Sequence, residues 1–286
     1  MKMFEPQRYI LVILVLLFHC FCVNGKHFVL VHGANHGAWC WYKVATNLKS
    51  SGHDVTALDM AASGTNPRKM EEIDSVAKYH EPLMSFMASL PPDEKVILVG
   101  HSLGGLSVSI AMENYPQKIS VAVFITATVV SHNLTFAEIR RRWGPSSAKD
   151  YFIWDGPNKA PILSSFGLEF FTSREYQLSP AEDLTLAMSL VRPLPPFMNN
   201  VKLLTEQTAV TKNKNGRVSK VYIISEKDNL KTEDIQRWII ESTGPYVEVI
   251  LIKDSDHMVL FSKPEKLSSE LLKIAAVKEE STKDCL

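Results

Sequence analysis

The feature that most constrains this chain is an apolar run that ends in a serine between small residues, Val96-Ile97-Leu98-Val99-Gly100-His101-Ser102-Leu103-Gly104-Gly105. A continuous apolar run is typical of a parallel strand that is buried on both faces. Gly-x-Ser-x-Gly directly after it predicts a sharp strand-to-helix turn that presents the Ser102 hydroxyl. Gly100 and Gly104 suit this turn because a Cβ there would crowd the chain. The pattern alone also fits an ordinary tight turn, so its context decides.

The segments around this serine alternate between strands and helices. Strands are predicted at 27–31, 54–58, 96–100 and 119–126, and helices at about 39–48, 73–90 and 103–114. The alternation resumes later with strands at 218–225 and 247–252, a helix at 232–241 and a final helix. This order predicts an α/β fold with a mostly parallel central sheet and helices on both faces.

The alternation is interrupted between about residues 131 and 199. No long strand is predicted in this segment. It contains repeated prolines and many aromatic residues. It is interpreted either as a small helical unit with its own aromatic core or as a cap that supplies apolar walls to a pocket. Two capping boxes are expected nearby, Ser179-Pro180-Ala181-Glu182 and Ser262-Lys263-Pro264-Glu265, each opening a helix. The expected organisation is a core of 26–130 and 200–286 with a cap insertion between them.

The first 25 residues have the pattern of a signal peptide. Lys2 and Arg8 precede a 15-residue apolar run, 9–23, and small residues follow near Gly25. The run is shorter than the roughly 18 apolar residues of a membrane span. We therefore expect entry into the secretory pathway, with an uncleaved membrane anchor as the alternative. Asn133-Leu134-Thr135 is a glycosylation sequon, which matters only if this leader directs secretion.

Charge and cysteine content exclude several classes of partner. Lys+Arg and Asp+Glu are both 31, so the chain has no basic surplus for nucleic acid or an anionic membrane surface. Cys20 and Cys22 lie in the leader, which leaves Cys40 and Cys285 and no disulfide framework. No Cys-x-x-Cys pair is present and the histidines are scattered, so we expect no metal.

A catalytic serine needs a general base, usually a histidine that is oriented by a carboxylate. In sheets of this type the acid and then the base follow the serine, on loops after later strands. His257 is the only histidine after residue 132, and it comes five residues beyond a predicted strand. Asp228 lies three residues beyond the preceding strand and is the favoured acid. The competing acids are Glu226, Asp234 and Asp256, and the competing histidines are His32, His36 and His101.

The same rule predicts the donors that would stabilise an oxyanion. They are the amide after the nucleophile and one from the loop after the first strand, which are the backbone N–H groups of Leu103 and Ala34. The helix that begins near Leu103 also directs its N-terminal amides toward Ser102 and favours negative charge there.

Taken together, the motifs resemble the plant methylesterase branch of the α/β-hydrolases, which also contains the hydroxynitrile lyases and the salicylate-binding esterase. The resemblance spans about residues 26–276. It is carried by His27-Phe28-Val29-Leu30-Val31-His32-Gly33-Ala34 with His36-Gly37-Ala38-Trp39, by Gly52-His53-Asp54-Val55-Thr56-Ala57-Leu58-Asp59 with Ala61-Ala62-Ser63-Gly64, by the serine stretch with Asp93-Glu94-Lys95 before it, and by Ser189-Leu190-Val191-Arg192-Pro193, Gln236-Arg237-Trp238 and Asp256-His257-Met258.

This resemblance implies an α/β-hydrolase fold and a serine esterase without a cofactor. Its substrates would be methyl esters of small plant-hormone acids such as salicylate, jasmonate or indole-acetate. The lyases of the group look different, with a threonine where this chain has Gly33 and a lysine where it has Met258. These two positions favour the esterase. A hydroxynitrile lyase, a hormone receptor without activity and a homodimer remain open.

Overall fold

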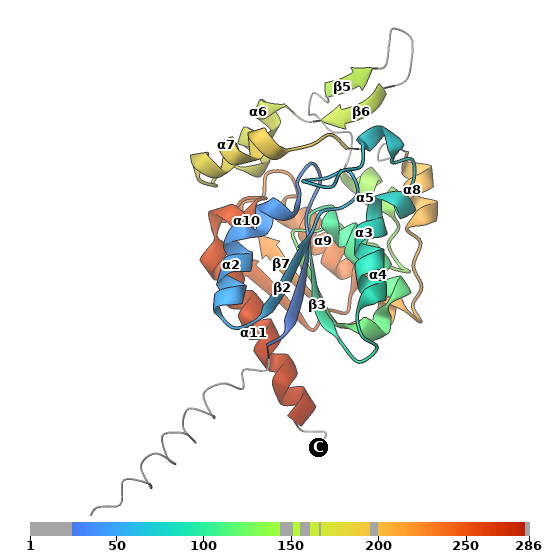
Figure 1. The fold of residues 1–286 in the computed structure, drawn as a ribbon, viewed down its shortest axis with the longest axis vertical. Helices are drawn as coiled ribbons and strands as arrows, with labels where there is room; N and C mark the ends of the chain where they lie inside the picture. Colours follow the sequence, from blue (N-terminus) through green and yellow to red (C-terminus); the bar gives the residue numbers. More distant parts are fainter. Residues whose placement is uncertain (1–24, 144–150, 155–160, 166, 195–199, 284–286) are drawn as a thin grey trace, which may run out of the picture.

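The centre of the molecule is a parallel six-stranded sheet (Figure 1). The computed structural model describes residues 25–143, 151–154, 161–165, 167–194 and 200–283. The strands are β1 (His27–Val31), β2 (Asp54–Leu58), β3 (Val96–His101), β4 (Ile119–Ile125), β7 (Lys220–Ser225) and β8 (Glu248–Ile252). Their order is β2-β1-β3-β4-β7-β8, and each neighbouring pair is parallel. The loops after β3, β7 and β8 therefore open at one edge of the sheet, where ligands bind in such folds.

Helices cover both faces of this sheet. On one face lie α2 (Tyr42–Ser50), α10 (Val259–Ser262) and α11 (Pro264–Lys283), and on the other α3 (Val76–Ser89), α4 (Gly104–Asn114), α8 (Val201–Gln207) and α9 (Glu233–Thr243) (Figure 1). Shorter turns are η1 (Ala38–Trp41), η2 (Met70–Glu72), η3 (Pro116–Lys118) and η6 (Asn215–Arg217). The predicted α/β architecture is confirmed, with bounds shifted by a few residues.

The two apolar cores follow from side chains that alternate along each strand. Phe28 and Leu30 pack into the cluster with α2 and α11, whereas Val29 and Val31 pack into the cluster with α3 and α4. Successive side chains of a strand point to opposite faces, so a run without polar residues is apolar toward both cores. β3 is buried at all six positions for this reason, which fixes the strand that leads to Ser102.

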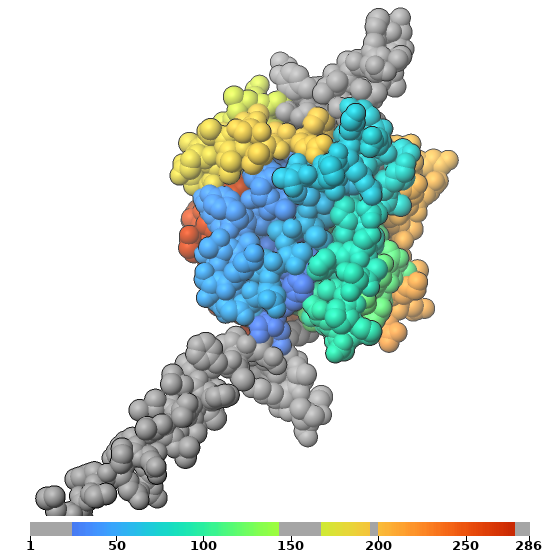
Figure 2. All heavy atoms as spheres, viewed as in Figure 1, coloured from blue at the N-terminus to red at the C-terminus, as the bar shows by residue number. Residues whose placement is uncertain are grey.

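The segment between β4 and α8 adds a layer at the carboxyl edge of the sheet. It contains α5 (Phe136–Trp143), an antiparallel pair β5 (Tyr151–Trp154) and β6 (Pro161–Ser165), α6 (Leu168–Phe170), η4 (Phe171–Glu175) and α7 (Ala181–Leu190). The short strand pair was not predicted. We refer to 168–194 as the cap segment, which lies directly on the N-terminal part of the core in Figure 2.

Polar contacts hold the cap segment on the core. Asp183 on α7 accepts hydrogen bonds from Tyr42 Oη at 2.9 Å and from Lys43 Nζ at 2.5 Å. The Arg192 guanidinium donates to the backbone oxygens of Gly64, Asn66 and Arg68. These contacts tie the cap segment to α2 and to the loop that follows β2.

Both predicted capping boxes are wrong in their side-chain contacts. The helix α7 begins at Ala181, and no side chain caps it. The Ser179 hydroxyl instead donates to Asp256 Oδ2 at 2.8 Å, and the Ser262 hydroxyl donates to Asp256 Oδ1 at 2.7 Å. A capping serine accepts a hydrogen bond from a backbone N–H group, whereas here both hydroxyls are oriented as donors toward the Asp256 carboxylate, a strong acceptor.

The predicted leader, 1–25, lies outside the described residues except for Gly25, and so do Cys20, Cys22 and Cys285. Cys40 is buried and forms no disulfide. Within the described ranges, none of the helices combines the length and the apolar character required to cross a bilayer.

Candidate active site

Ser102 occupies a strained turn between β3 and α4. Its backbone φ angle is +51°, a left-handed value that residues other than glycine rarely adopt. The turn is held because the Ser102 carbonyl accepts from the amides of Gly105 and Thr128, at 3.2 and 2.9 Å. A Cβ on Gly104 would lie 2.6 Å from the carbonyl oxygens of Val31 and His32. Gly104 therefore allows α4 to begin directly against the end of β1.

His257 and Asp228 complete a hydrogen-bonded chain with this serine. His257 Nε2 lies 2.8 Å from Ser102 Oγ, and His257 Nδ1 lies 2.7 Å from Asp228 Oδ2. The histidine follows β8, the aspartate follows β7 and the serine follows β3, so loops from three strands meet at this edge of the sheet. All three residues are buried, with Ser102 the most exposed at 6%. The structure thus brings together the three residues that the chain order predicts.

The environment of His257 favours its protonated form. Burial opposes the charge, but the charge and hydrogen bond of Asp228 outweigh this effect and raise the pKa of His257 above its usual value. Glu175 adds to the increase in pKa, whereas Lys231 opposes it. A histidine of this kind can accept the serine proton and hold it as an imidazolium that Asp228 stabilises.

Asp228 is fixed by hydrogen bonds at both of its oxygens. Oδ1 accepts from the backbone amides of Leu230 and Lys231 at 2.8 and 2.7 Å, while Oδ2 accepts from Thr126 Oγ1 as well as from His257. Thr126 has a φ of +40°, which is unusual for a β-branched residue. The backbone is strained at both Ser102 and Thr126, as is common at functional sites.

The backbone amides of Ala34 and Leu103 remain available at this edge of the sheet. In the part of the chain that the structure describes, neither amide donates a hydrogen bond to another residue. Leu103 follows the serine and precedes α4, and Ala34 lies in the turn after β1. Both positions agree with donors that point at a developing oxyanion.

The alternative candidates have structural roles. Asp256 binds Leu178 N, Ser179 and Ser262, and Glu226 accepts from Asp254 N, so neither faces the histidine ring. Asp234 lies in the first turn of α9. His32 accepts from Met60 N, His36 contacts Tyr176 Oη, and the His101 ring bonds the His257 carbonyl oxygen at 2.8 Å.

Comparisons with known proteins agree with a hydrolase site of this kind. Residues 26–264 match the family described as alpha/beta hydrolase fold. Methyl jasmonate esterase 1 of Vitis vinifera is 51% identical over 254 residues, which cover 87% of this chain and 96% of that protein. The chain belongs to the plant methylesterase family of α/β-hydrolases. As a member of this family it is an enzyme, a serine esterase.

Two further relatives show how widely this fold is shared. Salicylic acid-binding protein 2 of Nicotiana tabacum is 47% identical over 258 residues, which cover 88% of this chain and 98% of that protein. The crystal structure of tomato methylketone synthase I complexed with 2-tridecanone has a TM-score of 0.83 and 41% identity, covering 89% of this chain and 99% of that chain. The last name differs from those of the esterases, so the shared fold does not by itself define a substrate.

Gly33 and Met258, where the resemblance leads us to expect a difference from the lyases, lie beside the site. A Cβ on Gly33 would lie 2.9 Å from Ser102 Cβ and 3.1 Å from His101 Nδ1. Met258 is fully buried in the apolar cluster below the cap segment, and its amide donates to Glu175 O at 3.1 Å. Gly33 thus makes room for the serine, while Met258 packs behind the histidine.

Three polar side chains near the site were not predicted from the sequence: Thr126, Glu175 and Lys231. Lys231 is fully buried and its Nζ donates to Thr128 Oγ1 at 3.0 Å. Burial lowers the pKa of Lys231 to about 7, and Asp228 opposes this decrease. The only sequence signal for these residues was their position after β4, after β7 and within the aromatic-rich insertion, which does not distinguish them from their neighbours.

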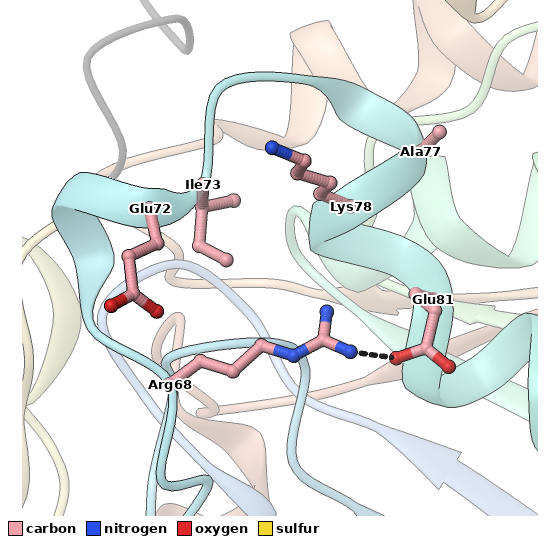
Figure 3. A pocket seen from close by; sticks show the side chains of 6 residues that line it. All are labelled: Arg68, Glu72, Ile73, Ala77, Lys78 and Glu81. Atoms are coloured by element: carbon pink, nitrogen blue, oxygen red, sulfur yellow. Dashed lines mark hydrogen bonds and ion pairs between the residues drawn. The ribbon is translucent and has the colours of Figure 1, made fainter.

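Other parts of the described chain add no second catalytic centre. No cluster of three or more His, Cys, Asp or Glu side chains with metal-binding geometry occurs among the described residues. A surface pocket of about 590 Å³ beside α3 is lined by Arg68, Glu72, Ile73, Ala77, Lys78 and Glu81, and Arg68 pairs with Glu81 at 2.9 Å (Figure 3). None of its lining residues belongs to the predicted site.

Proposed function

We propose that this enzyme hydrolyses methyl esters of small plant-hormone acids of the salicylate, jasmonate or indole-acetate type. The observation that carries the proposal is the hydrogen-bonded chain from Ser102 through His257 to Asp228. The names of the relatives in grape and tobacco support the substrate class. A small-molecule ester is the one partner that this chemistry requires.

The first half of the proposed reaction transfers the acyl group to the enzyme. Ser102 Oγ attacks the ester carbonyl carbon while His257 Nε2 takes its proton. Asp228 stabilises the imidazolium, and the amides of Ala34 and Leu103 bind the carbonyl oxygen as it becomes negative. When the tetrahedral intermediate collapses, the bond to the methoxy oxygen breaks. His257 gives its proton to that oxygen, and methanol leaves.

The second half releases the acid. Water attacks the acyl carbon, and His257 takes a proton from it in the same way. The bond to Ser102 Oγ then breaks, and His257 returns the proton to the serine. This sequence uses only side chains and backbone amides of the chain, so no cofactor has a role in it.

The direct test is methanol release from a panel of methyl esters by the purified protein. We expect turnover of at least one hormone ester and a loss on the order of 10⁶ in kcat for Ser102→Ala. Ser85→Ala, an exposed serine on α3, serves as the matched control and should retain full activity. Equal rates for Ser102→Ala and the unaltered protein would contradict the mechanism.

The same preparation tests the two other functions that the sequence left open. Cyanide release from mandelonitrile would indicate a lyase, although Met258 stands where the resemblance places a lysine and a side chain at Gly33 would crowd Ser102. Tight binding of free hormone acids without turnover of any ester would instead indicate a receptor.

A further inference from the structure

Glu175 is a buried acid that the proposed mechanism does not use. It is the last residue of η4 in the cap segment and is 3% exposed. Its carbonyl oxygen accepts from Met258 N, which places Glu175 beside the loop that carries His257. Its Oε2 is buried and has no hydrogen-bond partner among the described residues.

The other buried carboxylates in the described part of the chain differ from Glu175 in this respect. Asp183 binds Tyr42 and Lys43, and Glu270 binds Lys273. Asp228 and Asp256 each accept at least three hydrogen bonds. A buried polar atom without a partner costs free energy, so such atoms in native proteins are rare and require an explanation.

The charged and titratable groups around Glu175 lie in the loops after β7 and β8, in the cap segment and on η1. Burial raises the pKa of this carboxyl to about 7; His257 opposes the increase, and Asp228 and Asp256 add to it. Burial raises the pKa of the Tyr176 hydroxyl beside it and of the Cys40 thiol on η1, and the charge of Glu175 adds to both increases. The carboxyl can therefore lose its proton near neutral pH, next to the catalytic histidine.

We propose that Glu175 is a specificity-determining residue whose carboxyl accepts a hydrogen bond from an N–H or O–H group on the acid part of the ester. The inference rests on the proposed function, because the acyl group would be attached to Ser102, whose base His257 precedes the residue that binds the Glu175 carbonyl. A substrate donor satisfies the orphan oxygen. An ester without a donor leaves that oxygen buried and unpaired, so within the proposed substrate class this contact favours the salicylate and indole-acetate types over the jasmonate type.

Matched esters isolate this contact. Methyl indole-3-acetate and methyl benzofuran-3-acetate differ in that a ring oxygen replaces the ring N–H, and methyl salicylate and methyl benzoate differ by one hydroxyl. The ratio of kcat/KM within each pair is measured for the unaltered protein, Glu175→Gln and Glu175→Leu. We expect the unaltered protein to prefer the donor ester of at least one pair by about tenfold or more.

The two variants separate the hydrogen bond from the charge. Glu175→Leu removes the acceptor, so the ratio should approach one, chiefly through a lower KM for the ester without a donor. Glu175→Gln keeps an uncharged acceptor and should retain part of the preference. Thermal unfolding of both variants checks that the fold is intact, and removing the orphan carboxyl should not lower the melting temperature.

The pH dependence of the same ratio gives an independent measurement. His257 acts on both esters of a pair, so its titration cancels in the ratio. A carboxylate is a stronger acceptor than a carboxylic acid, so the ratio should increase as the pH rises through about 7 in the unaltered protein. It should stay constant in Glu175→Gln.

The outcomes distinguish this inference from the proposed function. Hydrolysis of the esters with a ratio near one in every pair, or with the same ratio in Glu175→Leu, overturns the role of Glu175 alone. The absence of any ester turnover by the folded protein overturns the proposed function and this inference with it.

Discussion

Asp228 shows how strongly single hydrogen bonds determine this site. Two backbone amides hold Oδ1, and Thr126 and His257 share Oδ2. With both oxygens occupied the carboxylate cannot rotate, so it sets the orientation of the imidazole ring. Its negative charge also balances the burial that would otherwise keep His257 neutral.

Asp228→Asn should therefore lower kcat and change the pH profile. We expect a loss on the order of 10⁴ in kcat, because an asparagine can hold the wrong tautomer of the histidine. The His257 pKa lies above 6.5 in the folded protein, so the acidic limb of kcat/KM should have its midpoint above that value. Without the carboxylate the imidazolium is no longer stabilised, so the midpoint should move to lower pH.

A pH series of initial rates measures both effects. Asp234→Asn on α9 removes a comparable charge from an acid that does not bind His257 and serves as the control. An unchanged midpoint in Asp228→Asn would show that the aspartate does not control the histidine.

At the level of elements, the contact between α4 and β1 positions the nucleophile. A Cβ on Gly104 would meet two backbone oxygens of the β1 end at 2.6 Å, and backbone atoms cannot move aside as a flexible side chain can. Gly104→Ala should reduce the free energy of unfolding by about 3 kcal/mol. It should also lower activity, because α4 has to shift away together with Ser102.

Urea unfolding compares this variant with Gly216→Ala, in which the nearest atom to the new Cβ is 3.5 Å away. The control should unfold at the same urea concentration as the unaltered protein. Equal midpoints for both variants would mean that the close approach of α4 to β1 is not needed.

The elements of the core could be predicted because their signals are local. The apolar run before Ser102, the strand after residue 218 and the strand before His257 each identify an element without knowledge of its neighbours. The order of serine, acid and base then selects Asp228 and His257, because parallel strands end at the same edge. The strand pair β5–β6 was not predicted. Its strands are only four and five residues long, and the prolines and aromatic residues around them obscure the alternation typical of a strand.

Contacts between distant residues were not predictable in the same way. Ser179 and Ser262 have the spacing of helix caps, yet both hydroxyls bind Asp256, which is 77 residues from the first and 6 from the second. Thr126 reaches Asp228 over 102 residues. Such pairs depend on how the loops pack at the edge of the sheet. The local pattern of a single sequence does not show this packing.

For the whole molecule, buried histidines link stability to pH. Burial lowers the pKa of His36 and His80 to about 3 and also lowers the pKa of His32 and His101. Below pH 6.5 the unfolded chain binds protons that the folded protein does not bind until about pH 3. Stability should therefore fall with decreasing pH in this window. The pKa of His257 is shifted in the opposite direction, so this residue opposes the effect of the other four.

His80→Gln tests this linkage, because glutamine can keep the hydrogen bond to Ser107 without the titration. The slope of the free energy of unfolding against pH should decrease by about 1.4 kcal/mol per pH unit between pH 6 and 4. His132→Gln, an exposed histidine, is the control. Identical slopes for all three proteins would exclude His80 as a source of acid sensitivity.

The leader and the sequon form one prediction about the complete chain. Asn133 is exposed in a turn, which makes its side chain accessible to modification. We propose that the protein enters the secretory pathway, loses residues up to about Gly25 and carries a glycan at Asn133. N-terminal sequencing and a glycosidase-sensitive mass shift that is absent in Asn133→Gln check this. An intact Met1 with no mass shift would contradict it.

Asp256 joins two parts of the molecule that could otherwise move separately. One of its oxygens holds the cap segment through Leu178 and Ser179, the other holds Ser262, and the next residue in the chain is His257. A change that displaces the cap segment would therefore also remove contacts of Asp256, the residue that precedes the catalytic base His257. One carboxylate thus couples the packing of the insertion to the loop from which the general base projects.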